Sequence, residues 1–383
     1  MSFAYLLIEF LDELTYGISE AAWPFIRDDL HLNYVQIGLA LSLPGILGNI
    51  IEPFIFTFAD AWKRRVVLLT GGIFFIISLA LTGISTSFLF LLSSYILFNP
   101  SSGALVGLSQ ASLMDLQPER REQNMARWTF AGSLGVVIGP ILLSGAAYIG
   151  FGWRGMFLGL ACIAILILLF VWKRIPTDQT TTEEIPGFRA ILAQFKSTFA
   201  ALKNWGIVRW LILLEFSDLM LDVLYGFLPL YFVDVAGFSP AQAALSVVVW
   251  TGVGMLGDFL LIPLVERIKG IDYLRISVII ELILFPLFLL SSQAWLKLTI
   301  VGMMGFFNAG WYAILKANLF ESMHGQSGAA LVLDNVSGLF GKLIPFGIGL
   351  AAQTFGIGSA MWILIAGPLA LFIGLPRKHT SRA

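Results

Sequence analysis

Apolar stretches of about twenty residues recur along the whole chain, and they restrict its fold more than any other feature. A stretch of this length matches an α-helix that crosses the hydrocarbon core of a membrane. Backbone groups in lipid need hydrogen-bond partners within the protein, so such stretches are helical unless they form the short alternating strands of a barrel. The sequence therefore predicts an all-α polytopic membrane protein.

The composition excludes several other classes of protein. Of the 383 residues, 58% are hydrophobic and 12% are charged, whereas soluble domains carry about 25% charged residues. This excludes a soluble enzyme, and a net charge of −1 excludes a nucleic-acid-binding protein, which needs a basic surface. The single cysteine excludes a disulfide framework and a thiolate metal site. We expect no enzymatic activity, no cofactor and no metal site.

Twelve segments are predicted to span the membrane, six in each half of the chain. They cover residues 3–27, 33–59, 66–86, 88–115, 124–149 and 153–172, then 207–233, 239–265, 273–293, 296–323, 328–354 and 358–375. This organisation predicts an N-terminal six-helix bundle at 1–172 and a C-terminal bundle with a short tail at 207–383. The segment 173–206 between them is predicted to be a cytoplasmic linker with an amphipathic helix on the membrane surface.

The distribution of Lys and Arg predicts the orientation. If the N terminus is cytoplasmic, 18 of the 23 Lys and Arg residues fall in cytoplasmic loops or the tail, and 3 fall in outer loops. Positively charged loops are retained on the cytoplasmic side. We therefore expect both termini in the cytoplasm and the protein in the inner (plasma) membrane of a prokaryote.

The chain matches itself when it is shifted by 206 residues. The matched pairs include Glu9 with Glu215, Asp12 with Asp218, Glu52 with Asp258, and Gly135 with Gly341. Each copy has an even number of helices, so both enter from the same side and are related by an axis along the membrane normal. Parallel repeats of this kind enclose a site at the membrane midplane and alternate its access. The repeat favours a carrier over a channel.

Several motifs, in order along the chain, resemble those of the major facilitator superfamily of secondary transporters. The segment FADAWKRR is similar to the family's G-x-x-x-D-x-x-G-R-R signature, through Asp60, Arg64 and Arg65. A second group is similar to the core of the G-x-x-x-G-P antiporter motif and consists of Gly135, Gly139 and Pro140. The resemblance implies two pseudo-symmetric six-helix bundles, a transport function without enzymatic chemistry, and gating roles for these six residues.

Ionisable residues inside the predicted spans mark candidate functional positions, because a charge in a membrane costs at least a few kcal/mol. The first helix carries Glu9, Asp12, Glu13 and Glu20 on one stripe, and the seventh carries Glu215, Asp218 and Asp222. Both stripes are expected to face a central aqueous cavity. That cavity is net acidic, so it favours cations and protons over anionic substrates.

Glu9 and Glu52 are predicted to lie at a similar depth, without a cation in their own half. Two nearby carboxylates in a low dielectric share a proton. We therefore expect proton coupling at Glu9 and Glu52, with Asp12 and Asp218 as further candidates. Lys342 is an alternative partner of Glu52, and in that case it acts as a gate latch and the coupling proton lies elsewhere.

The predicted substrate cavity has two further groups of residues. Glu215, Lys316 and Asp258 are expected to form a partly neutralised cluster in the second half. The residues that could line a cage for a lipophilic cation are Trp250, Asn308, Trp311 and Tyr312. Ordinary helix packing is the alternative interpretation of these aromatic residues.

The sequence favours a secondary active transporter with proton-coupled efflux of a cationic or neutral amphiphilic compound. A proton-coupled symporter that imports a small metabolite is the main alternative. A divalent-cation carrier and a non-transporting sensor are weaker ones. The expected partners are the lipid bilayer, protons and a small-molecule substrate, and the chain is expected to act as a monomer.

Overall fold

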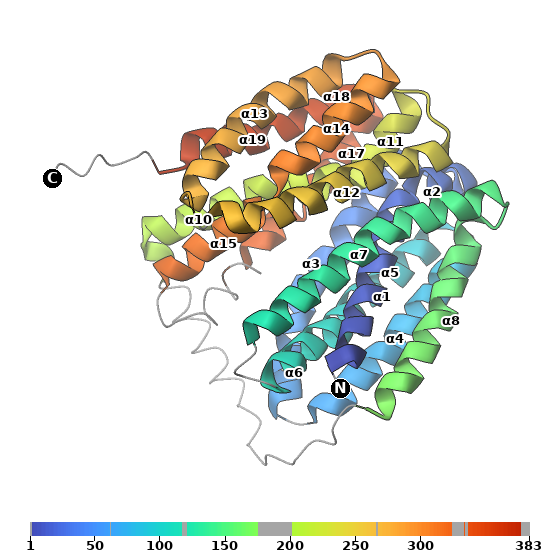
Figure 1. Ribbon diagram of the computed structural model, residues 1–383. Helices are drawn as coiled ribbons and strands as arrows, with labels where there is room; N and C mark the ends of the chain where they lie inside the picture. The colour runs from blue at the N-terminus through green and yellow to red at the C-terminus, as the bar shows by residue number, and fades with distance from the viewer. Residues whose placement is uncertain are drawn as a thin grey trace. The chain divides into compact units, whose positions relative to one another are not determined.

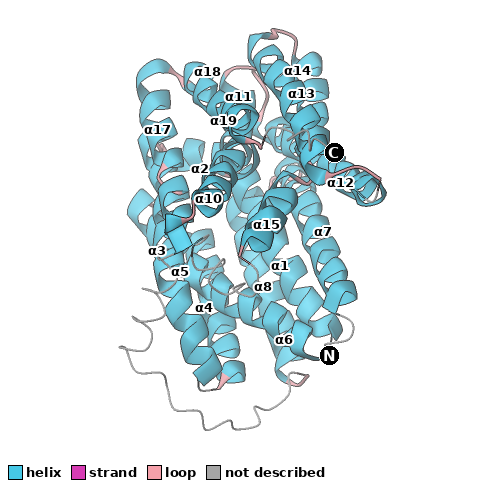
Figure 2. Ribbon diagram, turned by 90° about the vertical axis from the view of Figure 1, so that its left-hand side faces the viewer, coloured by secondary structure: helices cyan, strands magenta, loops and turns pink. Residues whose placement is uncertain are grey.

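The structure is a computed structural model, and it describes residues 2–61, 63–116, 121–174, 201–265, 267–323, 333 and 336–376. All regular elements in these ranges are helices, as Figure 2 shows. Ten of the described helices are long and apolar enough to cross a membrane. Two further helical runs carry the predicted acidic stripes, so the arrangement is consistent with twelve spans. The predicted all-α membrane fold is confirmed.

The first half of the chain forms six helical runs (Figure 1). They are α1 (Ser2–Ala21) with α2 (Trp23–Leu30), α3 (Tyr34–Ala61), α4 (Arg64–Ile84), α5 (Phe88–Ser102) with α6 (Leu108–Leu116), α7 (Arg121–Tyr148) and α8 (Gly152–Trp172). Pro24 at the start of α2 has no N–H to continue the hydrogen bonds of α1, so the predicted first helix is divided there. A π-helical segment, Gly103–Gly107, joins α5 to α6.

The second half also forms interrupted helical runs. They are α10 (Trp205–Asp218) with α11 (Leu224–Asp234), α12 (Pro240–Val265), α13 (Gly270–Leu290), α14 (Ala294–Asn308) with α15 (Trp311–Ser322), α17 (Ile344–Phe355), and α18 (Ile357–Ala360) with α19 (Ala366–Gly374). A π-helical segment, Leu219–Val223, joins α10 to α11. The predicted single helix at 296–323 is two helices, because Ala309 and Gly310 leave the helical conformation.

The interruptions follow the internal repeat. Gly103, the first residue of the π-helical segment between α5 and α6, corresponds to Ala309 at the break between α14 and α15. Each irregular turn lies near the middle of its span. Discontinuous helices at this depth form the substrate and ion sites of many transporters, because they release backbone groups from helical hydrogen bonds.

Contacts within the chain define two compact units, which are described separately. The first contains the described residues up to 174 together with Gly226–Val248 and Lys342–Ile357. The second contains the described residues of 201–225, 249–341 and 358–376. The predicted linker and amphipathic helix at 173–206 lie largely outside the described residues.

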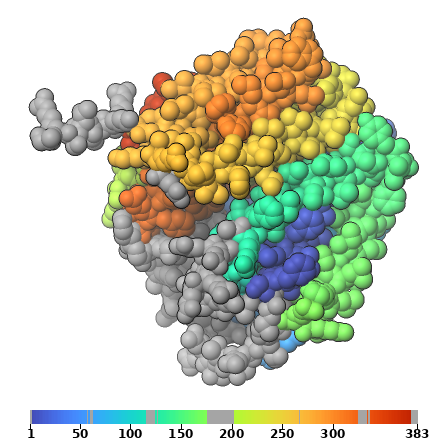
Figure 3. Space-filling model, viewed as in Figure 1, coloured from blue at the N-terminus to red at the C-terminus, as the bar shows by residue number. Residues whose placement is uncertain are grey.

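Helix α1 is central to the first unit. It packs against α7 and α8, and Figure 3 shows part of it at the surface between those two helices. Ile8, Leu11 and Ile18 of α1 are almost fully buried in this packing. The outer faces of other helices carry exposed apolar side chains, such as Leu166 at 68% and Phe259 at 72% exposure. Such faces are typical of helices that are covered by lipid.

Candidate functional site

Three carboxylates of α1 form a cluster within the first unit. Glu9 is 7% exposed, and one of its oxygens lies 2.7 Å from where a Cβ would stand on Gly132 of α7. Asp12 accepts a hydrogen bond of 2.7 Å from Ser102 Oγ, directly before the π-helical segment. Glu13 and Asp12 are the charged neighbours of Glu9. The predicted stripe on α1 is thus a polar cluster in contact with α5 and α7.

Glu52 of α3 lies next to the same cluster. Its carboxyl carbon is 2.6 Å from where a Cβ would stand on Gly103, so it faces the π-helical segment. The charged neighbours of Glu52 are Asp12 and Lys342. The structure therefore links Glu9 and Glu52 through Asp12, and not as the direct pair that the sequence suggested. Lys342 is a charged neighbour of Glu52, which is the alternative partner considered from the sequence.

Gly135 and Gly139, two of the predicted gating residues, lie where α7 crosses α1. A Cβ on Gly139 would stand 2.7 Å from the carbonyl oxygen of Leu14, and a Cβ on Gly135 would stand 2.6 Å from the Leu14 nitrogen. The ring of Pro140 lies 3.1 Å from where a Cβ would stand on Gly17 of α1. Small residues allow two membrane helices to approach this closely.

The loop motif after α3 is only partly described. Arg65 donates a hydrogen bond of 2.8 Å to the carbonyl oxygen of Trp172, which ties the start of α4 to the end of α8. Arg64 is the first residue of α4. The side chain of Asp60 lies outside the described residues. The gating role of this motif therefore stays a prediction.

A group of residues at one end of the first unit was not predicted from the sequence. Arg27 Nη1 donates to Asp234 Oδ2 at 2.6 Å, and the Tyr34 hydroxyl donates to the same oxygen. The backbone N–H of Tyr34 donates to Gln353 Oε1 at 3.1 Å. Burial lowers the pKa of Arg27, but the hydrogen bond and charge of Asp234 outweigh it and raise that pKa, so the guanidinium stays charged. We name Arg27, Tyr34, Asp234 and Gln353 the end clamp.

The end clamp joins the two halves of the sequence inside one compact unit. Arg27 and Tyr34 belong to the first copy of the repeat, whereas Asp234 and Gln353 belong to the second. Arg27 and Asp234 are 207 residues apart. No sequence pattern pairs residues at this separation, so only the structure could find the clamp.

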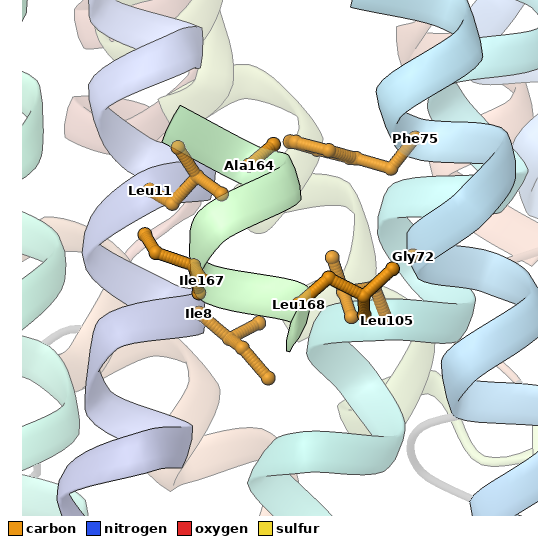
Figure 4. Close-up of a pocket in the computed structure, with 8 residues that line it drawn as sticks. All are labelled: Ile8, Leu11, Gly72, Phe75, Leu105, Ala164, Ile167 and Leu168. Carbon is orange, nitrogen blue, oxygen red and sulfur yellow. The ribbon is translucent and has the colours of Figure 1, made fainter. Parts of the chain in front are cut away.

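The cavity in Figure 4 is a packing void of the first unit. Its volume is about 10 Å³, and it lies among Ile8, Leu11, Gly72, Phe75, Leu105, Ala164, Ile167 and Leu168. This is the space of about one water molecule. The lining side chains are all apolar, so none of them can hold a polar guest. The void is too small to be a substrate site.

The second unit has a polar centre at the break between α14 and α15. Gly310 has a φ of 72°, a left-handed conformation that glycine adopts without strain. Asp258 of α12 accepts a hydrogen bond of 3.0 Å from the Gly310 N–H, and the Tyr273 hydroxyl donates to the Ala309 carbonyl oxygen at 3.1 Å. Asp258 therefore caps α15, and its predicted grouping with Glu215 and Lys316 stays a prediction.

A buried glutamate beside this break was missed in the sequence analysis. Glu281, in the middle of α13, is fully buried, and neither of its carboxyl oxygens has a hydrogen-bond partner among the described residues. Asn308, the last residue of α14, is its polar neighbour. Asn308 Nδ2 donates to the carbonyl oxygen of Met220, 3.3 Å away in the π-helical segment after α10. The signal was available, because Glu281 is the one ionisable residue between Ser277 and Leu290.

The four residues of the predicted cation cage have different environments. Trp311 is fully buried, and its Nε1 donates to Ser277 Oγ at 2.8 Å. Trp250 is nearly buried, with its ring centre 5.4 Å from that of Tyr225. Tyr312 is 48% exposed. In this conformation the two tryptophans contribute to helix packing and do not line an open cage with Tyr312.

The remaining predicted site residues lie on the acidic stripes or near them. One oxygen of Glu215 lies directly over Gly341, as Glu9 lies over Gly132 in the other half. Lys316 Nζ donates to the Tyr312 hydroxyl at 2.9 Å. One carboxyl oxygen of Glu20 lies 2.9 Å from where a Cβ would stand on Gly226. Asp218 is half-buried, and Asp222 is exposed. Among the described residues, no three His, Cys, Asp or Glu side chains are grouped as metal ligands.

Comparisons with known proteins identify the family. At the sequence level, the quinolone resistance protein NorA of Staphylococcus aureus (strain COL) is 22% identical over 97% of this chain and 95% of its own length. The hexuronate transporter of Bacillus subtilis (strain 168) is 25% identical over 96% of this chain and 90% of its own length. At the structural level, the crystal structure of the nucleoside transporter NupG shares the fold, with a TM-score of 0.75, 13% identity and 98% of both chains covered.

The family model of the Major Facilitator Superfamily matches residues 5–344, which is nearly the whole chain. The match agrees with the helical membrane fold and with the full-length similarity to transporters. Family and fold thus indicate a membrane transporter for a small molecule and not an enzyme. This chain belongs to the Major Facilitator Superfamily.

Proposed function

We propose that this transporter is a proton-coupled exporter of a small cationic or neutral amphiphilic compound. The observation that carries the proposal is the cluster of Glu9, Asp12, Glu13 and Glu52 beside the π-helical segment of the first unit. Four carboxyl groups from two helices share this region, and Lys342 is the cation beside Glu52.

Such a cluster is suited to exchange protons with a substrate. Carboxylates that are close together and shielded from water repel each other, so at least one of them holds a proton near neutral pH. A cation that enters the cavity stabilises the ionised form and displaces that proton. Binding of substrate and binding of protons are therefore competitive, which is the thermodynamic basis of antiport.

Asp12 is the central residue of this proposal. It is the neighbour of both Glu9 and Glu52, and Ser102 binds it at the irregular turn of the fourth span. We assign proton coupling to Asp12 and Glu9, with Asp218 as the corresponding residue of the second half. Lys342 lies beside Glu52, so this pair fits the gate latch. Glu13 and Glu20 add negative charge to the first unit, and Glu215 and Asp222 add it to the second, which favours cations.

Similarity to NorA, whose name describes quinolone resistance, supports the export direction. Similarity to a hexuronate transporter supports the alternative, a proton-coupled symporter that imports a metabolite. The acidic cavity disfavours an anionic substrate such as a hexuronate, so we favour export of a cationic or neutral compound. We also propose a monomer in the plasma membrane with both termini in the cytoplasm.

Efflux of a fluorescent lipophilic cation from intact cells tests this function. The wild-type protein should lower the dye content of cells, and a proton uncoupler should abolish the effect. Asp12→Asn should also abolish it, because the cluster loses its shared carboxylate. Asp272→Asn is the matched control, since Asp272 is paired with Arg275 at the start of α13, outside the cluster.

Two results would contradict the proposal. Efflux that continues in the presence of the uncoupler would exclude proton coupling. Dye content that rises when the wild-type protein is produced, and falls with the uncoupler, would favour the symport alternative.

A further inference from the structure

The buried carboxyl group of Glu281 lies near the middle of a candidate membrane span. It is residue 12 of the 21 in α13, and Asn308 beside it lies at the centre of the 29-residue span Ala294–Ser322. Both side chains are more than nine-tenths buried. Figures 1 and 2 show α13 and α14 side by side in the second unit.

Charged and titratable groups on the elements around Glu281 have other neighbours. On α14, Lys297 Nζ donates to the carbonyl oxygen of Phe288 at 2.7 Å, near the end of α13. On α13 itself, Asp272 pairs with Arg275, and Tyr273 binds the break. On α15, the titratable groups are Tyr312, Lys316 and Glu321, while α19 and the preceding turn Met361–Ile365 have none. In the described structure, Glu281 is fully buried, and Asn308 is its polar neighbour.

This environment offers few hydrogen-bond donors to an ionised carboxylate. Both oxygens of Glu281 and Oδ1 of Asn308 are buried without a partner in the described structure. All three atoms are acceptors, and one of the two N–H groups of Asn308 Nδ2 is used to bind Met220, which leaves one N–H for Glu281. A charge here is unfavourable because the side chain is fully buried and no cationic side chain acts on it among the described residues. One added proton removes the charge and supplies the missing donor.

We propose that Glu281 is a proton-binding site of the second half of the transporter. The carboxyl group is neutral in this conformation and donates its proton to Asn308 Oδ1. Proton binding at Glu281 does not depend on the proposed function, but the role of this proton in transport does. In that role it is a second coupling proton, in addition to the proton of the cluster of Glu9, Asp12, Glu13 and Glu52.

The internal repeat shows that the fold does not need an acid at this position. The residue that corresponds to Glu281 in the first half is Phe75, which is fully buried against the ring of Phe98 at a centre-to-centre distance of 5.1 Å. The residue that corresponds to Asn308 is Ser102, which binds Asp12. In each half, the polar side chain before the irregular turn thus lies next to a carboxyl group.

The position of Asn308 provides a route for release of the proton. Asn308 directly precedes the break at Ala309 and Gly310, which is held by Asp258 and Tyr273. Movement at this break separates Asn308 from Glu281 and admits water to the carboxyl group. Glu281 then ionises, so its proton binding follows the conformation of the tenth span.

Infrared spectroscopy of the purified protein tests the site without a transport assay. A buried protonated carboxyl group has a C=O stretching band that an ionised carboxylate lacks. We expect this band in the wild type at neutral pH and the loss of one of its components in Glu281→Gln, whose amide imitates the neutral acid, while any component from the cluster of Glu9, Asp12, Glu13 and Glu52 remains. Asn308→Ala should shift the band, because the hydrogen bond to Oδ1 is removed. Glu321→Gln, at an exposed helix end, should leave the band unchanged.

A wild-type spectrum that Glu281→Gln does not change would overturn the proposal. If the wild-type band appears only after sodium is removed, the site holds a sodium ion and the proposal is also wrong. If Glu281→Gln does not fold, Glu281→Phe replaces it in the experiment, because phenylalanine is the corresponding residue (Phe75) in the first half of the chain. Uncoupler-insensitive efflux together with loss of this component of the band in Glu281→Gln would refute the proposed function and leave this site intact.

Discussion

The contact between α1 and α7 makes a quantitative prediction about Gly139. A side-chain carbon needs about 3.4 Å from a neighbouring atom, and the Leu14 oxygen is 2.7 Å from the Cβ position of Gly139. Gly139→Ala therefore requires a displacement of about 0.7 Å (3.4 minus 2.7). The neighbouring atoms of Leu14, Gly17 and Ile18 are all backbone, so no side-chain rotation can relieve the clash. Overpacking of this kind costs about 1–3 kcal/mol.

Gly145 is a matched control on the same helix. A Cβ at Gly145 would have no atom within 4 Å. Replacement of an unconstrained helical glycine by alanine stabilises a helix by about 0.5–1 kcal/mol. Unfolding of purified protein in detergent, measured by circular dichroism, should show a lower midpoint for Gly139→Ala and an equal or higher midpoint for Gly145→Ala. Equal midpoints for the two variants would refute the close contact of α1 with α7.

Two further predictions concern the end clamp and the break in the tenth span. In a Cys162→Ser background, we expect a reducible bifunctional thiol reagent that links Arg27→Cys to Asp234→Cys to lower transport to background, because the clamp would have to open in each cycle. A reductant should restore transport. Cross-linking without loss of transport would exclude this role. Asp258→Leu should lower stability by about 1 kcal/mol through loss of the cap on Gly310, whereas Asp258→Asn, which keeps an acceptor, should change it by less than about half of that; thermal unfolding of both variants would detect the difference, and equal loss would contradict the capping role.

The sequence predicted the helices better than their interruptions. Long apolar runs specify spans because the backbone in lipid has no other way to satisfy its hydrogen bonds. The break at Gly310 depends on Asp258 and Tyr273, which reach it from two other helices. No local pattern contains that information, so the tenth span was predicted as one helix.

The site was predicted in its residue types and less well in its pairings. The acidic stripe of α1 followed from helical periodicity, but the position of Asp12 as the common neighbour of Glu9 and Glu52 depends on where α3 places Glu52 in the folded unit. Glu281 differs from these cases. The sequence shows a single acid in the middle of an apolar span, and the structure adds that its side chain is fully buried.

The most direct test of the account is the measurement of proton flux that a substrate gradient drives across a liposome membrane. The purified transporter is reconstituted with a pH-sensitive dye inside, and a cationic substrate is added outside. We predict that substrate entry drives protons out, that the internal pH rises, and that Asp12→Asn abolishes this change while Asp272→Asn retains it. Substrate movement by the wild type without any change of internal pH, or an undiminished change with Asp12→Asn, would contradict proton coupling through the α1 cluster.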